Sequence, residues 1–222
     1  MAKYRSYKLL CPIARALDRI GDRWTLLIIR DLHAGPARFT DLQRGLTGIA
    51  ANLLTERLAK LVSDGLAEKT DGGHGTSVYA LTDCGRKTSD IIFDLAVFGS
   101  QFEPEEEITK PGNLRTVATT LGAASRRVAP ADARFEALVV VDGEKMCLRV
   151  NGNQSEMIYE ECKATDLIFT TSYSALLAVT EGKMALSTFT ENHVTLKILS
   201  PGKEVEFMSL MTEIVSLLRQ EI

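Results

Sequence analysis

Five polar side chains, Asn52, Thr55, Glu56, Arg57 and Lys60, are spaced so that one face of a helix would carry them, with Arg57 at its edge. A stripe of leucines occupies the opposite face, which a folded core would bury. An asparagine amide can pair with adenine, and a lysine or arginine can pair with guanine or with a phosphate. This arrangement predicts a helix that reads DNA bases in the major groove.

Other chemistry finds little support in the sequence. The phosphate-binding pattern G-x-x-x-x-G-K-[ST], the G-x-S-x-G elbow and the H-E-x-x-H zinc motif are all absent. The four cysteines form no C-x-x-C pair, and the three histidines lie far from them and from one another. We therefore expect no enzyme activity, no catalytic residue, no metal site and no cofactor. The cysteines are expected to be reduced, small buried residues.

Two short predicted helices position the polar face. Thr40-Asp41-Leu42-Gln43 has the form of a capping box and opens a helix that ends near Gly45. A turn at residues 48–50 leads into the helix that carries Asn52, which ends at Gly65. Two such helices joined by a tight turn form a helix-turn-helix, whose second helix can enter a major groove about 12 Å wide.

A hairpin is predicted directly after the second helix, from LAEKTD and TSVYALT around the glycines at 72–75. This hairpin makes the winged variant of the helix-turn-helix, and its tip can reach the DNA backbone or the minor groove. His74 at the tip is a candidate contact. Arg38 and Thr40, at the start of the helix-turn-helix, are the remaining candidates for DNA binding.

The chain divides into a basic and an acidic part. Residues 1–102 carry 14 Lys and Arg against 11 Asp and Glu, a net charge of +3, and residues 103–222 carry 12 against 18, a net charge of −6. The segment FEPEEEITKPGN contains two prolines and an acidic run, which is typical of a linker. We predict a DNA-binding domain over 1–102, a linker over 103–111 and a second domain over 112–222.

No apolar run approaches the roughly 18 residues that span a bilayer, and the start has no signal-peptide core, so we expect a cytoplasmic protein with no membrane contact.

The second domain changes from a helical to a mixed period. Asp142-Gly143 and Asn151-Gly152 are turn signals, and Met146, Leu148 and Val150 alternate with other residues as in a half-buried strand. DLIFTT and VTLKIL are typical of further strands, and apolar spacing predicts helices around them. The pattern indicates an α+β domain with a mixed sheet covered by helices, so the whole chain falls in the α+β class.

Several joined motifs resemble those of the HxlR-type winged-helix transcription regulators. They cover roughly residues 8–102 and include Cys11-Pro12, residues 20–24, Arg38-Phe39, Gly65-Leu66 and residues 79–82. The resemblance implies a homodimer that binds operator DNA, with its dimer contact on the first helix and on the helix after the wing. The apolar residues that fit this contact are Ile13, Leu17, Ile91, Leu95, Phe98 and Phe102. Among the departures from the family, Ala50 stands where a serine usually caps the recognition helix.

The segment from about residue 112 onward resembles the sterol-carrier-protein type 2-like domains. The likeness is clearest after Ala164, where a strand, a helix, the Gly182-Lys183 turn and an apolar C-terminal helix follow in order. Such domains can hold an apolar tunnel, so the resemblance implies a pocket for a small hydrophobic ligand. Its candidate lining residues are Leu176, Leu177, Met184, Phe189, Met208 and Met211. The same side chains would also suit a solid core.

The predicted function is a dimeric transcription regulator, a repressor, that binds double-stranded operator DNA and senses a small hydrophobic ligand through its C-terminal domain. Two alternatives remain open. One is a carrier of lipids or other hydrophobic ligands whose N-terminal half serves only dimerisation, although a carrier would not need the basic face at 38–60. The other is a thiol redox-responsive regulator acting through Cys11, because the cysteine at this position is an oxidant sensor in some HxlR-type proteins.

Overall fold

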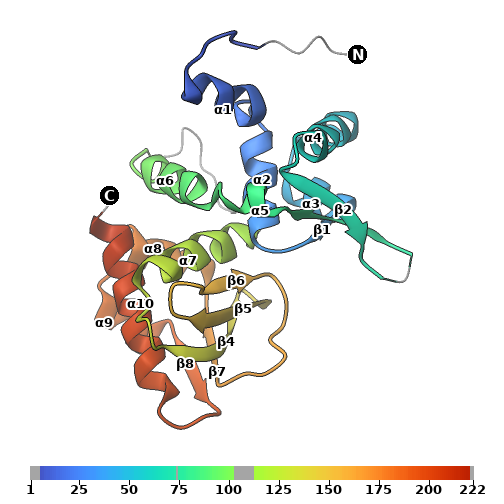
Figure 1. Ribbon diagram of the computed structural model, residues 1–222. Coiled ribbons are helices and arrows are strands. Elements are labelled where there is room, and N and C mark those ends of the chain that lie inside the picture. Colours follow the sequence, from blue (N-terminus) through green and yellow to red (C-terminus); the bar gives the residue numbers. More distant parts are fainter. Residues whose placement is uncertain (1–5, 74, 103–112, 221–222) are drawn as a thin grey trace. The chain divides into compact units, whose positions relative to one another are not determined.

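The computed structural model describes residues 6–73, 75–102 and 113–220 (Figure 1). Two compact units divide the chain, Met1–Thr88 and Ser89–Ile222. The division falls before helix α6 (Ser89–Gly99), whereas we predicted it after residue 102. Helix α6 groups with the second unit because it packs on helix α7 (Arg115–Val128) of that unit. The predicted linker at 103–111 lies outside the described residues.

The first unit combines short helices with a three-stranded sheet. Its elements are α1 (Pro12–Ile20), α2 (Thr25–His33), β1 (Ala37–Arg38), α3 (Phe39–Gly45), α4 (Ala51–Ser63), β2 (Ala67–Asp71), β3 (Ser77–Leu81) and α5 (Asp83–Arg86). The strands are antiparallel in the order β1-β3-β2, so β2 and β3 form the predicted hairpin. The helix-turn-helix followed by a wing is thereby confirmed (Figure 1).

Buried aliphatic side chains hold the first unit together. Ile28 and Ile29 of α2 and Leu42 of α3 are fully buried, as are the leucines that stripe α4. The Asp22 carboxylate accepts hydrogen bonds from the N–H groups of Trp24 and Thr25 at 3.0 and 3.2 Å, just before α2 begins at Thr25.

Helix α3 begins two residues earlier than the sequence predicts. Its first residue is Phe39, and Thr40 does not act as the cap. The Asp41 carboxylate instead accepts from the N–H of Arg38 at 3.3 Å, one half of a capping box, which fixes the start of the helix.

The second unit is a mixed five-stranded sheet with helices. Its remaining elements are β4 (Arg134–Val141), β5 (Glu144–Asn151), β6 (Glu156–Ile158), β7 (Leu167–Thr171), α8 (Tyr173–Thr180), α9 (Leu186–Asn192), β8 (Thr195–Ile198) and α10 (Lys203–Gln220). The strand order is β6-β5-β4-β7-β8, with β4 and β7 parallel and the other neighbours antiparallel. The α+β class is therefore confirmed, and the specific likeness to sterol-carrier domains stays a prediction.

Alternate residues of the sheet point into one core. Met146, Leu148 and Val150 of β5 are buried, as their spacing predicts. Phe207 of α10 packs on this face, with its ring centroid 6.1 Å from that of Phe135 and 5.2 Å from that of Phe169. The aromatic contacts thus fix α10 against the central strands of the sheet.

The cysteines differ from the sequence prediction. Cys147 and Cys162 form a disulfide, and Cys11 and Cys84 are free but exposed. Cys147 lies on the face of β5 opposite Met146, and the chain that leads from β6 to β7 brings Cys162 to it. The expectation of four reduced and buried thiols was wrong because this pairing depends on a chain reversal that no local pattern marks.

Hydrophobic helices of membrane type are not found in the part of the chain that the structure describes. None of its helices is both long and apolar enough to cross a bilayer.

Candidate nucleic-acid interface and ligand cavity

Helix α4 presents the predicted reading face. Leu54, Leu58 and Leu61 are fully buried, so the opposite side of the helix faces outward. The turn before α4 depends on Gly48, whose φ of 93° is one that side chains disfavour. Ala50 occupies the cap position and supplies no side-chain hydrogen bond to the helix start.

Asn52 and Thr55 are both exposed on this face. Asn52, in the first turn, is where a recognition helix contacts base edges. The Thr55 hydroxyl donates to the carbonyl oxygen of Ala51 at 2.9 Å, so its oxygen remains available only as an acceptor. Asn52 is therefore the better of the two candidates for pairing with both the N6 donor and the N7 acceptor of an adenine.

Arg57 and Lys60 are held by carboxylates within the unit. Nε of Arg57 lies 3.0 Å from Oδ1 of Asp22, and its Nη1 lies 2.9 Å from Oε1 of Glu56. Nζ of Lys60 lies 2.5 Å from Oδ2 of Asp64, and the Lys60 side chain is only 15% exposed. A DNA phosphate would have to compete with these carboxylates for both cations.

The contact residues around α3 and the wing are more accessible. Arg38 and Thr40 are exposed at the start of α3, and His74 lies outside the described residues. Nζ of Lys69 lies 5.9 Å from the centre of the Tyr79 ring across the wing strands. Arg44, in the last turn of α3, is exposed and was missed, although it is the one basic residue between Arg38 and Arg57 in the sequence.

The predicted dimer residues form uncovered apolar stripes. On α1 the side chains of Ile13 and Leu17 are exposed, and on α6 and just after it those of Ile91, Leu95, Phe98 and Phe102 are exposed. Phe98 and Phe102 pack against each other with ring centroids 5.1 Å apart, and Phe98 remains 58% exposed. Stripes of this kind are typical of surfaces that a partner covers.

Helix α6 is anchored to α7 by charged contacts. Arg127 of α7 reaches the carboxylates of Asp90 and Asp94, and its guanidinium lies 3.9 Å from the centre of the Phe93 ring. Burial would lower the pKa of Arg127, but Asp94 and Asp90 raise it overall, so the guanidinium stays charged. Arg126 also donates to the hydroxyl of Ser89 at the first residue of α6. These contacts hold one side of α6 while the apolar stripe remains uncovered.

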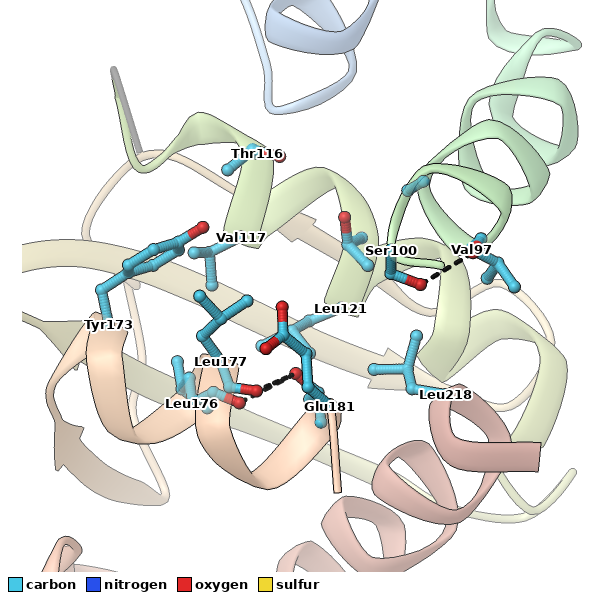
Figure 2. A pocket seen from close by; sticks show the side chains of 13 residues that line it. Val97, Ser100, Thr116, Val117, Leu121, Tyr173, Leu176, Leu177, Glu181 and Leu218 are labelled. Carbon is cyan, nitrogen blue, oxygen red and sulfur yellow. Dashed lines mark hydrogen bonds between the residues drawn. The ribbon is translucent and has the colours of Figure 1, made fainter. Parts of the chain in front are cut away.

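A cavity of about 230 Å³ lies among the helices of the second unit (Figure 2). Side chains of α6, α7, α8 and α10 and of the residues just after α6 and α8 line it, mostly with apolar atoms. Of the predicted ligand contacts, Leu176 and Leu177 of α8 belong to this lining. The cavity therefore lies between helices and not beneath the sheet.

The other predicted ligand contacts lie elsewhere. Phe189 and Met211 are buried in the core, and the carbonyl oxygen of Met184 accepts from Nη2 of Arg219 at 2.5 Å. Met208 borders a separate open surface depression beside Val205. The sequence search missed the contributions of α6 and α7 to the cavity, because their inward residues have the spacing of any packed helix.

Comparison with known proteins identifies the first part of the chain. The sequence profile described as "HxlR-like helix-turn-helix" matches residues 19–107. An uncharacterised HTH-type transcriptional regulator of Mycobacterium tuberculosis strain H37Rv is 37% identical over 97 residues, which is 43% of this chain and 61% of that protein. YvaP, an uncharacterised HTH-type transcriptional regulator of Bacillus subtilis, is 30% identical over 97 residues, or 42% of this chain and 89% of YvaP.

A solved structure gives a similar but looser match. The quinone-bound form of YodB from Bacillus subtilis is 29% identical, covers 42% of this chain and all of its own length, and has a TM-score of 0.37. Of the two sequence relatives, this chain covers less than two thirds of the length of the mycobacterial protein and nearly the whole length of YvaP. The agreement of profile, relatives and helix-turn-helix geometry shows that the chain belongs to the HxlR-like helix-turn-helix family.

Proposed function

We propose that this protein is a DNA-binding transcription regulator, a repressor, whose second unit senses a small apolar ligand. The observation that carries the proposal is the outward face of α4. Exposed Asn52 and Thr55 sit over a fully buried leucine stripe, in a segment that lies within the family match. A polar face held rigidly by packing is what base reading in a major groove requires.

The uncovered stripes support a homodimer. An operator read by a dimer presents two half-sites about one DNA turn apart, so both copies of α4 must be held at a fixed spacing. A second copy of this chain covering Leu95 and Phe98 of α6 would supply that constraint, and it would remove apolar side chains from water.

Ligand sensing follows from linkage between the cavity and DNA binding. A ligand that prefers the conformation with low DNA affinity weakens DNA binding by the ratio of its affinities for the two conformations, and by no more. The cavity among α6, α7, α8 and α10 supports this part of the proposal.

Substitution of the reading face tests the DNA-binding proposal. A preferred site is first selected from a randomised duplex library, and binding is then followed by fluorescence anisotropy. Asn52→Ala should lose about 1–3 kcal/mol on the preferred site and little on unrelated DNA. Glu191→Gln, an exposed change on α9 of the other unit, is the control. Equal affinities of the wild type and Asn52→Ala for the preferred site would reject α4 as the reading helix.

The redox alternative keeps one favourable observation. Cys11 is free and exposed directly before α1, so an oxidant can reach it. The carrier alternative is less well supported, because a cavity of about 230 Å³ is smaller than the roughly 300–1,000 Å³ of pockets that enclose drug-sized ligands. A sterol or a long acyl chain would not fit inside it without rearrangement.

A further inference from the structure

We propose that the cavity of the second unit binds a single-ring aromatic amine. The inference rests on the proposed ligand-sensing function and gives it a chemical class. The volume of the cavity limits the size of the ligand. About 230 Å³ exceeds the roughly 150 Å³ that accepts benzene and falls below the volume of pockets for drug-sized ligands. One aromatic ring with a short substituent fills such a space.

Apolar side chains form the part of the site that would hold the ring. Val117 and Leu121 of α7 face Leu176 and Leu177 of α8, and Leu218 of α10 closes one end (Figure 2). An aromatic ring between these aliphatic groups would exchange water for close contacts with them.

Two hydroxyl groups of the site can accept hydrogen bonds from a ligand but cannot donate them. The Ser100 hydroxyl already donates to the carbonyl oxygen of Val97 at 2.7 Å, and the Thr180 hydroxyl donates to that of Leu176 at 2.9 Å. Their oxygens can therefore only accept from a ligand. No lysine, arginine or histidine is found among the described residues that line the cavity.

Glu181 supplies the negative charge of the lining. Its carboxylate points from the end of α8 toward the space beside Leu177 and Leu121 (Figure 2). Oε2 of Glu181 lies 2.8 Å from Nζ of Lys183, and the side chains are 21% and 57% exposed, respectively. An exposed pair of this kind contributes little stability, so an ammonium group can take the place of Lys183 at small cost. A ligand carboxylate would lie beside the Glu181 carboxylate, and the repulsion between the two negative charges disfavours acids.

The cavity shares a helix with the proposed dimer surface. Ala96 and Val97 of α6 line it, while Leu95 and Phe98 of the same helix stay exposed. A ligand that contacts the inner side of α6 therefore biases the position of its outer side. Because linkage is reciprocal, amine affinity should change when the protein is bound to DNA.

Thermal unfolding of the full chain tests the site with three probes that share a ring. 2-Phenylethylamine carries a positive charge, phenylacetate a negative charge and ethylbenzene none. The amine should raise the melting temperature progressively with concentration, because it binds only the folded state. Ethylbenzene should bind more weakly, and phenylacetate should cause no shift.

Two variants locate the effect. Glu181→Gln should weaken amine binding roughly tenfold or more and leave ethylbenzene binding unchanged, since only the charged hydrogen bond is lost. Glu191→Gln on α9 removes an exposed carboxylate away from the cavity and should leave both affinities unchanged. Thr120→Phe fills the cavity from α7 and should abolish binding of both probes.

Any of three results would overturn the proposal. If phenylacetate binds as tightly as the amine, or if Glu181→Gln has no effect, the amine class is wrong while a ligand site can stand. If no probe binds, the cavity is not a site for single-ring ligands and ligand sensing fails with it. DNA titrations of the same preparation report separately on the DNA-binding function.

Discussion

Breaking the Cys147–Cys162 bond should destabilise the second unit measurably. The bond joins β5 to the chain between β6 and β7 and closes a loop with a sequence separation of 15. Closing a loop of about 15 residues removes conformational freedom from the unfolded chain that corresponds to about 3 kcal/mol. Reduction should therefore lower the free energy of unfolding by up to about this amount.

Other contacts to the same loop limit the effect. Nη2 of Arg149 lies 2.7 Å from Oε1 of Glu160, and Nζ of Lys145 lies 2.9 Å from Oε1 of Glu161. These exposed pairs contribute about 0–1 kcal/mol each, so they keep the loop near the sheet without replacing the bond. We expect the melting temperature of the second unit to fall by about 5–10 °C on reduction.

Calorimetry with and without a phosphine reductant measures the change. Thiol titration in denaturant should find two reactive thiols before reduction, those of Cys11 and Cys84, and four afterwards. Cys162→Ser removes the bond and should unfold at the lower temperature under both conditions. Cys11→Ser, which leaves the bond intact, should retain the full response to the reductant.

Two outcomes would refute the reasoning. Four reactive thiols after treatment with diamide, an oxidant that couples neighbouring thiols, would show that the pair does not form. A bond that forms but leaves the melting temperature unchanged on reduction would show that the unfolded chain gains no freedom when the loop opens.

Three further substitutions test the DNA-binding unit and the dimer. If Lys60 leaves Asp64 for a DNA phosphate, Lys60→Ala should reduce the slope of log affinity against log salt concentration by about 0.9, as measured by anisotropy at several salt concentrations. An unchanged slope with a lower melting temperature would mean that Lys60 serves only as a partner of Asp64. Leu95 of α6 is 44% exposed, and Leu95→Glu should give monomers in light scattering. Val205→Glu, at an apolar and 70% exposed position on α10, should leave the protein dimeric. Dimers in both variants would exclude the α6 stripe as the dimer interface. Ala50→Ser should add a cap to α4 and raise stability by about 1 kcal/mol in denaturant titrations, and no gain would mean that the helix start is already satisfied.

Local signals made the helix-turn-helix predictable. The leucines of α4 recur at the helical period, and their burial is what the period predicts. Gly48 marked the turn before α4. In the second unit the alternation around Leu148 identified a strand, because side chains of a strand point to opposite faces in turn. Each of these features depends on residues within a few positions of one another.

Features that join distant parts of the chain were not predictable in the same way. Lys60 and Arg57 are not free cations, because each forms an ion pair with an aspartate. Only the fold shows which aspartates face them. Met184 and Met208 have the flexible side chains that suit ligand pockets, yet neither lines the cavity, to which α6 and α7 contribute beside α8 and α10. The grouping of α6 with the second unit likewise depends on its contacts with α7, which the sequence does not encode as a pattern.

The parallel pairing of β4 with β7 has a consequence for how the chain reaches its native state. Ala137 lies opposite Leu167, so the two strands pair across a long stretch of chain that contains β5 and β6. Contacts of such long sequence separation slow folding, because the entropy of loop closure is lost before the pairing energy is gained. The β4–β5 hairpin should therefore appear early with one edge of β4 unpaired. During that interval the edge could pair with another chain, so refolding yield of the second unit should fall as protein concentration rises.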